Sequence, residues 1–172
     1  MSITFPNIPR RVVTGHLNGV ATIVEDNIVK NVMKDESGFI VSDPWASEGM
    51  PAKFEEAEIF KEFFPKLHDN GSLFRYVVIP PDSKTKEFYP EQPDQPHHLM
   101  HTTQTLDYVM ILSGEVYLVM ENCETLLKPG DIVIQTGTSH AWSNRTEEPV
   151  IQWAVLLDAA GTGRGRGEAE VE

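Results

Sequence analysis

The sequence predicts an all-β protein, and three observations support this class. Runs rich in apolar and β-branched residues cover 108–120 and 125–135, where the turn sequences Ser-Gly-Glu and Lys-Pro-Gly-Asp interrupt them. Side chains of opposite character alternate over 73–80, which is typical of a strand with two distinct faces. The length of 172 residues fits one domain with a core of its own. We therefore expect a single domain made mainly of antiparallel strands.

The N-terminal segment 1–51 is expected to contribute strands and a loop. Residues 10–33 predict two strands around the hairpin signal Asn18-Gly19. Residues 39–51 predict a short strand that leads into a loop rich in Pro and Gly. At the other end, 149–158 predicts a last strand, and the Gly-rich charged tail 159–172 is expected to be disordered.

One segment, 52–71, has helical rather than strand periodicity. Its apolar residues recur at intervals of three to five positions, with Glu and Lys between them, and Pro65 followed by Asp-Asn-Gly ends the pattern. The spacing predicts a short helix packed on the outside of the strands. After the strand at 73–80, residues 81–100 contain four prolines without periodicity, which predicts a long loop that acts as a lid.

Composition excludes some partners. A formal net charge of −12 argues against nucleic-acid binding, which needs clustered Lys and Arg. No apolar run approaches the roughly 20 residues that span a bilayer, and the N-terminus lacks the apolar region of a signal peptide. We expect a cytoplasmic protein with no membrane partner and a small molecule as ligand.

Between residues 97 and 144, carboxylate, glycine and histidine residues recur at fixed intervals. A carboxylate is followed after six residues by a glycine, and a Gly-Asp pair is followed by a histidine and then, four positions later, an asparagine. These spacings resemble the two motifs of the cupin superfamily. The matching positions are Asp107, Gly114, Gly130, Asp131, His140 and Asn144.

The resemblance implies a cupin-type double-stranded β-helix, or jelly-roll barrel, with its core at 72–158 and a short outer helix. It also implies that the strands of 1–51 pack across a homodimer. The family places a His-x-His pair shortly before the first carboxylate, and here that pair would be His101 and Thr103. Because a neutral hydroxyl is a weak metal ligand, the resemblance implies a degenerate metal-binding motif.

The candidate catalytic residues are His101, Asp107 and His140, which the resemblance brings to one point inside the barrel. Two histidines and one carboxylate can hold a divalent metal ion, here iron, manganese, zinc or nickel, with His97 as a further candidate ligand. Without a metal, the same residues form an acid–base cluster in apolar surroundings that shift proton affinities. Both interpretations stay open at this point.

Three further residues are candidates for substrate binding. If Arg75 faces the barrel interior, its guanidinium could anchor an anionic group, and if it faces outward it is an ordinary solvated arginine. Thr103 has the same strand parity as His101. Trp142 has the parity of His140 and could stack on a planar substrate or pack in the wall.

The leading functional hypothesis is an enzyme, a lyase or isomerase, that performs non-redox acid–base chemistry on a small organic acid or a phenolic or enolisable compound. Decarboxylation, dehydration and isomerisation all fit. One alternative is a metal-dependent dioxygenase, and another is a cupin that binds its ligand without catalysis.

Overall fold

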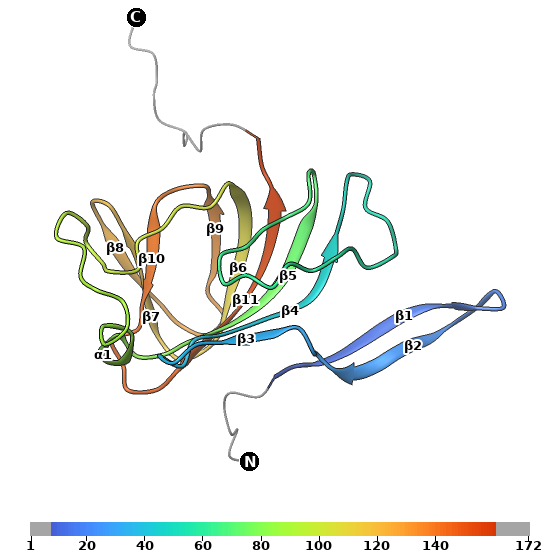
Figure 1. The fold of residues 1–172 in the computed structure, drawn as a ribbon, viewed down its shortest axis with the longest axis horizontal. Coiled ribbons are helices and arrows are strands. Elements are labelled where there is room, and N and C mark those ends of the chain that lie inside the picture. Colours follow the sequence, from blue (N-terminus) through green and yellow to red (C-terminus); the bar gives the residue numbers. More distant parts are fainter. Residues whose placement is uncertain (1–7, 161–172) are drawn as a thin grey trace, which may run out of the picture.

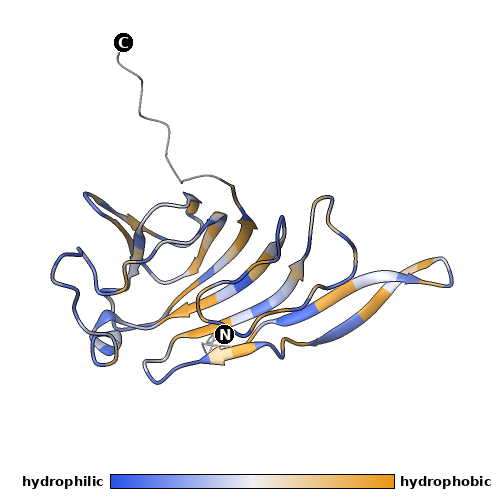
Figure 2. Ribbon diagram, turned by 45° about the horizontal axis from the view of Figure 1, so that its top comes forward, coloured by the Kyte–Doolittle hydropathy of each residue, from blue (hydrophilic) through white to orange (hydrophobic). Residues whose placement is uncertain are grey.

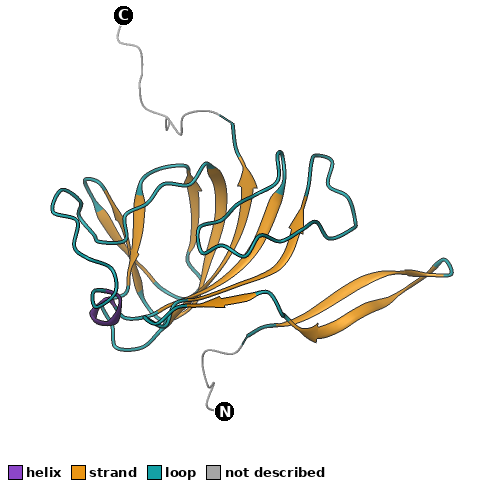
Figure 3. Ribbon diagram, viewed as in Figure 1, coloured by secondary structure: helices purple, strands orange, loops and turns teal. Residues whose placement is uncertain are grey.

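The structure is a computed structural model that describes residues 8–160, and strands make up most of it (Figure 3). A single helix of four residues, α1 (Asp82–Thr85), occurs among these residues. The strands are β1 (Arg10–Leu17), β2 (Val20–Ile28), β3 (Val32–Lys34), β4 (Ile40–Ser47), β5 (Ser72–Ile79), β6 (Thr105–Ser113), β7 (Val116–Met120), β8 (Glu124–Leu127), β9 (Ile132–Thr136), β10 (His140–Ser143) and β11 (Val150–Asp158).

Two antiparallel sheets form the walls of the barrel (Figure 1). The larger sheet has the strand order β3-β4-β5-β11-β6-β9, and the smaller has the order β10-β7-β8. One apolar cluster joins the two sheets, because Ile79, Ile111 and Val150 of the larger sheet pack with Val116 and Leu118 of the smaller. The all-β, jelly-roll prediction is confirmed.

Strand parity decides which residues face the interior. Along β6, burial alternates, with Asp107, Val109 and Ile111 buried and Tyr108 and Met110 exposed. Because successive side chains on a strand point to opposite faces, the apolar residues of the core bring Asp107 into the barrel with them.

The turn between β6 and β7 requires glycine at position 114. Gly114 has a φ of +80°, and a Cβ built there would lie 2.9 Å from a methyl carbon of Val150. A residue with a side chain would meet both an unfavourable backbone conformation and a fully buried neighbour. Backbone conformation and packing together therefore explain the glycine of the first motif.

The helix predicted within 52–71 is absent, and that prediction is wrong. The segment is irregular, and its apolar residues do not form one buried face, since Phe54 is 98% exposed while Ile59 and Leu67 pack on the core. The backbone carbonyls of Glu62 and Phe63 accept hydrogen bonds from the side chain of Arg75, so they are bound by another strand rather than by a helix of their own.

The loop 81–100 is ordered by its own polar contacts. Asp82 accepts hydrogen bonds from Ser143 Oγ at 2.6 Å and from the backbone N–H of Asn144 at 3.0 Å. Further along, Tyr89 donates to Asp35 at 2.5 Å, and Thr85 lies 2.8 Å from the ring of His98. The loop therefore forms a wall that is attached to the barrel at several points.

The predicted hairpin at Asn18-Gly19 is present, and β1 and β2 extend away from the barrel as a separate two-stranded arm (Figure 1). Within residues 8–160, no helix is long and apolar enough to cross a membrane. The predicted disordered tail lies outside the described residues from position 161 onward.

Candidate functional site

A cavity of about 350 Å³ lies in the barrel. Most of its wall is apolar. Six of the seven candidate residues from the sequence line it, and His97 does not: Arg75, His101, Thr103, Asp107, His140 and Trp142. Pockets that bind small molecules are mostly apolar with a few convergent polar groups. The cavity has that character.

His101 and His140 form a direct pair across the cavity wall. The two residues are backbone partners in an isolated bridge, and each backbone N–H donates to the other residue's carbonyl at 2.9 Å. This pairing brings their ring centroids to 4.4 Å, with the ring planes at 48°. Trp142, two residues along β10, meets His140 edge-on at 5.7 Å.

The hydrogen bonds of the two rings decide where each carries its proton. Nδ1 of His101 lies 2.9 Å from the carbonyl of Leu99, and Nδ1 of His140 lies 2.9 Å from that of Thr138. Because a carbonyl can only accept, each Nδ1 carries the proton and donates it. The amide of Gln135, 3.1 Å from Nδ1 of His140, donates to Thr138. The Nε2 lone pair of each ring is thus left as an acceptor.

Burial keeps both rings neutral. It is the main cause that lowers the pKa of His140 to about 4, and repulsion from His101 lowers it further. Burial also lowers the pKa of His101, whereas its bond to Leu99 opposes the change. At pH 7, therefore, two neutral imidazoles lie side by side with unprotonated Nε2 atoms.

Asp107 shares the cavity but does not bond to either histidine. The residue is 6% exposed, and its Oδ1 has no hydrogen-bond partner among the described residues. Burial raises the pKa of the Asp107 carboxyl, while the Thr105 hydroxyl and the charge of Arg75 act in the opposite direction. A buried acceptor without a donor is costly, so this atom marks a place where a ligand could bind.

The described residues do not fit a metal ion held by three protein ligands. No group of three or more His, Cys, Asp or Glu side chains between residues 8 and 160 is placed to share one. His97, the further candidate, is turned elsewhere: its Nε2 lies 3.3 Å from Asp82, and its Nδ1 accepts from the backbone of Leu99. The histidine that lines the cavity instead is His98, its neighbour.

Arg75 faces the interior, but its donors are already bound. Nε and Nη2 each donate to one carboxylate oxygen of Asp43 at 2.8 Å, while Nη1 and Nη2 donate to the carbonyls of Phe63 and Glu62. Both charged side chains are almost fully buried. The expected role as anchor for an anionic substrate is therefore corrected, since Arg75 pairs with Asp43 and holds the segment 62–65 beside the cavity.

Sequence reasoning missed four contributors to this site: Asp43, Gln152, His98 and the Phe63-Phe64 pair. Two of them have sequence features that could have identified them. Asp43 is a charged residue inside a predicted strand, where burial requires a partner. Gln152 has the inward parity of Ala154 and Leu156 on β11. The contribution of 62–65 depends on a contact distant in sequence and had no local signal.

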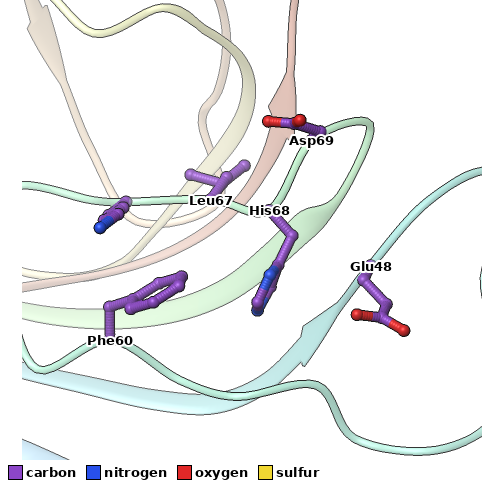
Figure 4. A pocket seen from close by; sticks show the side chains of 6 residues that line it. Glu48, Phe60, Leu67, His68 and Asp69 are labelled. Carbon is purple, nitrogen blue, oxygen red and sulfur yellow. The ribbon is translucent and has the colours of Figure 1, made fainter.

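A second hollow, of about 420 Å³, shares no residue with the cavity (Figure 4). It is open, and its polar groups hold its own walls together, since His68 donates to the carbonyl of Glu58 at 2.8 Å and Lys66 lies over the ring of Phe60. The paired imidazoles make the barrel cavity the candidate site.

Comparison with known proteins agrees with this architecture. Residues 85–156, which contain both histidines and Asp107, match the cupin domain family. Over these residues, the chain is similar to cupin domains.

The relatives of this chain are distant. Phomopsin biosynthesis cluster protein C' of Diaporthe leptostromiformis is 36% identical over 77 residues, which are 44% of this chain and 34% of that protein. The cupin-domain-containing oxidoreductase srdD of Neurospora crassa is 24% identical over 96% of this chain and 85% of its own length. The chain thus spans about a third of the first of these relatives.

Among solved structures, this chain is similar to a Cupin 2 conserved barrel domain protein from Salinispora arenicola. The two share 20% identity, over 56% of this chain and 72% of that one, with a TM-score of 0.37.

Proposed function

We propose that this cupin-domain protein is an enzyme that moves protons on a small enolisable molecule bound in the cavity. One observation carries the proposal, namely the pair of neutral imidazoles whose Nε2 lone pairs are free beside an apolar cavity. General base catalysis requires an unprotonated group within reach of the substrate, and desolvation strengthens such interactions.

The proposed step is removal of a proton from a carbon next to a carbonyl group. We assign the role of base to His101, whose Nε2 lone pair faces the cavity and takes the proton. The electron pair of the broken C–H bond is delocalised into the carbonyl group, which gives the enolate. The neutral ring of His140 can share the proton that His101 has taken up. Return of that proton to a different carbon completes an isomerisation without gain or loss of atoms.

The relatives suggest where such a substrate would come from. Several carry names as members of fungal biosynthesis clusters. We propose that the substrate is an intermediate of a biosynthetic route of this kind.

Deuterium incorporation tests the proposal without knowledge of the natural substrate. Wild-type protein in D₂O, supplied with a panel of aryl ketones and 1,3-diketones, should accelerate exchange at the carbon next to the carbonyl, as followed by mass spectrometry. His101→Gln should lower that rate on the order of 10²- to 10⁴-fold, the usual contribution of a general base. Tyr108→Phe, on the outer face of the same barrel, is the matched control. A rate equal to that of the control variant would contradict the proposal.

A second candidate function is oxidation, favoured by the relatives named cupin-domain-containing oxidoreductases. Metal analysis of the purified protein, together with oxygen uptake in the presence of the same panel, separates the two. Stoichiometric metal with substrate-dependent oxygen uptake would select oxidation. Tight binding of a panel compound without either reaction would select a cupin that only binds its ligand.

A further inference from the structure

Four polar atoms of the cavity wall are acceptors that lack donors. Nε2 of His101 and of His140 carry lone pairs, as their Nδ1 bonds require. Oδ1 of Asp107 and Oε1 of Gln152 have no hydrogen-bond partner among residues 8–160. Both side chains are at least 94% buried and line the same cavity. A ligand that satisfies this wall must bring hydrogen-bond donors.

The positive charge in the cavity wall is already paired without a ligand. Arg75 is the one lysine or arginine that lines the cavity in the described part of the chain, and Asp43 neutralises it through two hydrogen bonds of 2.8 Å. A buried carboxylate or phosphate would therefore find no free cation, and an unpaired ion in such surroundings is strongly disfavoured.

The rest of the wall favours a flat apolar body. Phe39, Phe63, Phe64 and Trp142 contribute rings, and Val77, Val109 and Leu156 contribute aliphatic surface. Aromatic rings pack face-to-edge or offset against one another with a gain beyond area alone. The volume of about 350 Å³ lies near the lower end of the about 300–1,000 Å³ common for small-molecule sites.

We infer that the cavity takes a neutral aromatic molecule bearing a hydroxyl group, a phenol or its enol tautomer, and rejects the corresponding carboxylic acid. The hydroxyl donates to the acceptor wall formed by Asp107, Gln152 and the two Nε2 atoms, while the ring packs against Trp142 and the phenylalanines. The inference rests on the proposed function in that it concerns the same cavity, and it decides between the acid and the phenolic class of substrate.

A matched set of naphthalenes tests this inference by binding alone. Isothermal titration of the full-length protein at pH 7 would compare 2-naphthol, 2-methoxynaphthalene, 2-naphthoate and 2-naphthylmethylammonium. The naphthol should bind about tenfold more tightly than the methyl ether, which keeps the shape and loses the donor. The naphthoate should bind more weakly by on the order of a hundredfold. Equal binding of naphthol and ether, tighter binding of either ion, or no binding of naphthol would overturn the inference.

Gln152→Met keeps the length of the side chain and removes its acceptor. This variant should reduce the affinity advantage of the naphthol over the ether by about tenfold. Tyr108→Phe should leave the series unchanged. If the Gln152 variant does not fold, as judged by circular dichroism, the ligand series on the wild type decides alone. Because no turnover is measured, donor-selective binding without deuterium exchange would remove the proposed function and leave this inference standing. Deuterium exchange into the ketones without donor-selective binding would overturn this inference and leave the proposed function standing.

Discussion

At the scale of single residues, the site depends on two imidazoles that are kept neutral by burial. The backbone bridge between His101 and His140 fixes their separation, and the carbonyls of Leu99 and Thr138 fix their tautomers. A pair of unprotonated histidines in apolar surroundings is costly to ionise, and that cost links the chemistry of the site to the stability of the fold.

The first prediction concerns stability as a function of pH. The folded pKa of His140, about 4, lies below the unfolded value of 6.5, so the unfolded chain binds more protons between these limits. The contribution of neutral His140 to the unfolding free energy is present above pH 6.5 and is lost as the pH falls toward 4. Since one pKa unit corresponds to about 1.4 kcal/mol, the loss is on the order of 3 kcal/mol.

Urea unfolding of the wild type and His140→Gln across pH 4–7 measures this contribution as the difference between the two curves. That difference removes the effect of Asp107, whose raised pKa acts with the opposite sign. We expect the wild type to lose more unfolding free energy than the variant as the pH falls. Parallel curves would mean that His140 titrates normally.

A second prediction at this scale concerns Arg75 and Asp43. Removal of one partner leaves the other charge buried and unpaired, so Arg75→Met should cost about 3–5 kcal/mol of unfolding free energy. The double variant with Asp43→Leu should recover part of that loss. Arg10→Met, which removes the exposed pair with Asp26, is the control and should cost far less, because solvent screens exposed pairs. Equal costs for the two single variants would contradict a buried pair.

At the scale of elements, the segment 62–65 closes one side of the cavity. Arg75 binds its carbonyls, and the ring of Phe64 meets His101 edge-on at 5.9 Å although its own side chain is largely exposed. The segment therefore contributes to the cavity wall while it adds little to the core.

A prediction follows for Phe64. Phe64→Ala should raise KM several-fold or weaken ligand binding, because it removes an aromatic wall, and should change unfolding free energy by less than about 0.5 kcal/mol, as is usual for surface substitutions. Phe88→Ala, at an exposed residue outside the cavity, is the control for both measurements. A large loss of stability with unchanged binding would place Phe64 in the core instead.

The strands could be predicted from the sequence because their evidence is local. Alternation over 73–80 put Arg75 on the same strand face as Leu73 and Val77 but left open which face points inward. The spacing from Asp107 to Gly114 and from Gly130 to His140 located both halves of the site. The conformation of segment 52–71 could not be predicted from local evidence. Its apolar spacing fits a helix, but Arg75 and Asp43, from distant strands, decide the conformation through contacts that no local pattern records.

At the scale of the whole molecule, the single chain leaves apolar surface exposed to solvent. The arm formed by β1 and β2 exposes Leu17, Val20 and Ile23, each at least 60% exposed, and Figure 2 shows apolar stretches along it. The outer face of β6 and β9 exposes Tyr108, Met110, Ile132 and Ile134 as paired neighbours. Exposed patches of this kind often mark protein interfaces.

We predict that the protein is a homodimer in which this arm packs on a second copy. Sedimentation velocity should give twice the chain mass, and Leu17→Lys with Ile23→Lys should give the monomer with its barrel folded. Thr14→Lys, on the same arm at a polar position, is the control. A wild-type monomer at micromolar concentration would contradict the prediction.

The most direct test of the central claim is the protonation state of the two histidines. Nitrogen-15 NMR of the imidazole rings, assigned with His101→Gln and His140→Gln, reports both the tautomer and the pKa of each ring. Both rings should carry their proton on Nδ1 at pH 7, and His140 should titrate near pH 4. A proton on Nε2 of either ring, or titration of His140 near its ordinary value of 6.5, would contradict the claim that the cavity is faced by a pair of free imidazole bases.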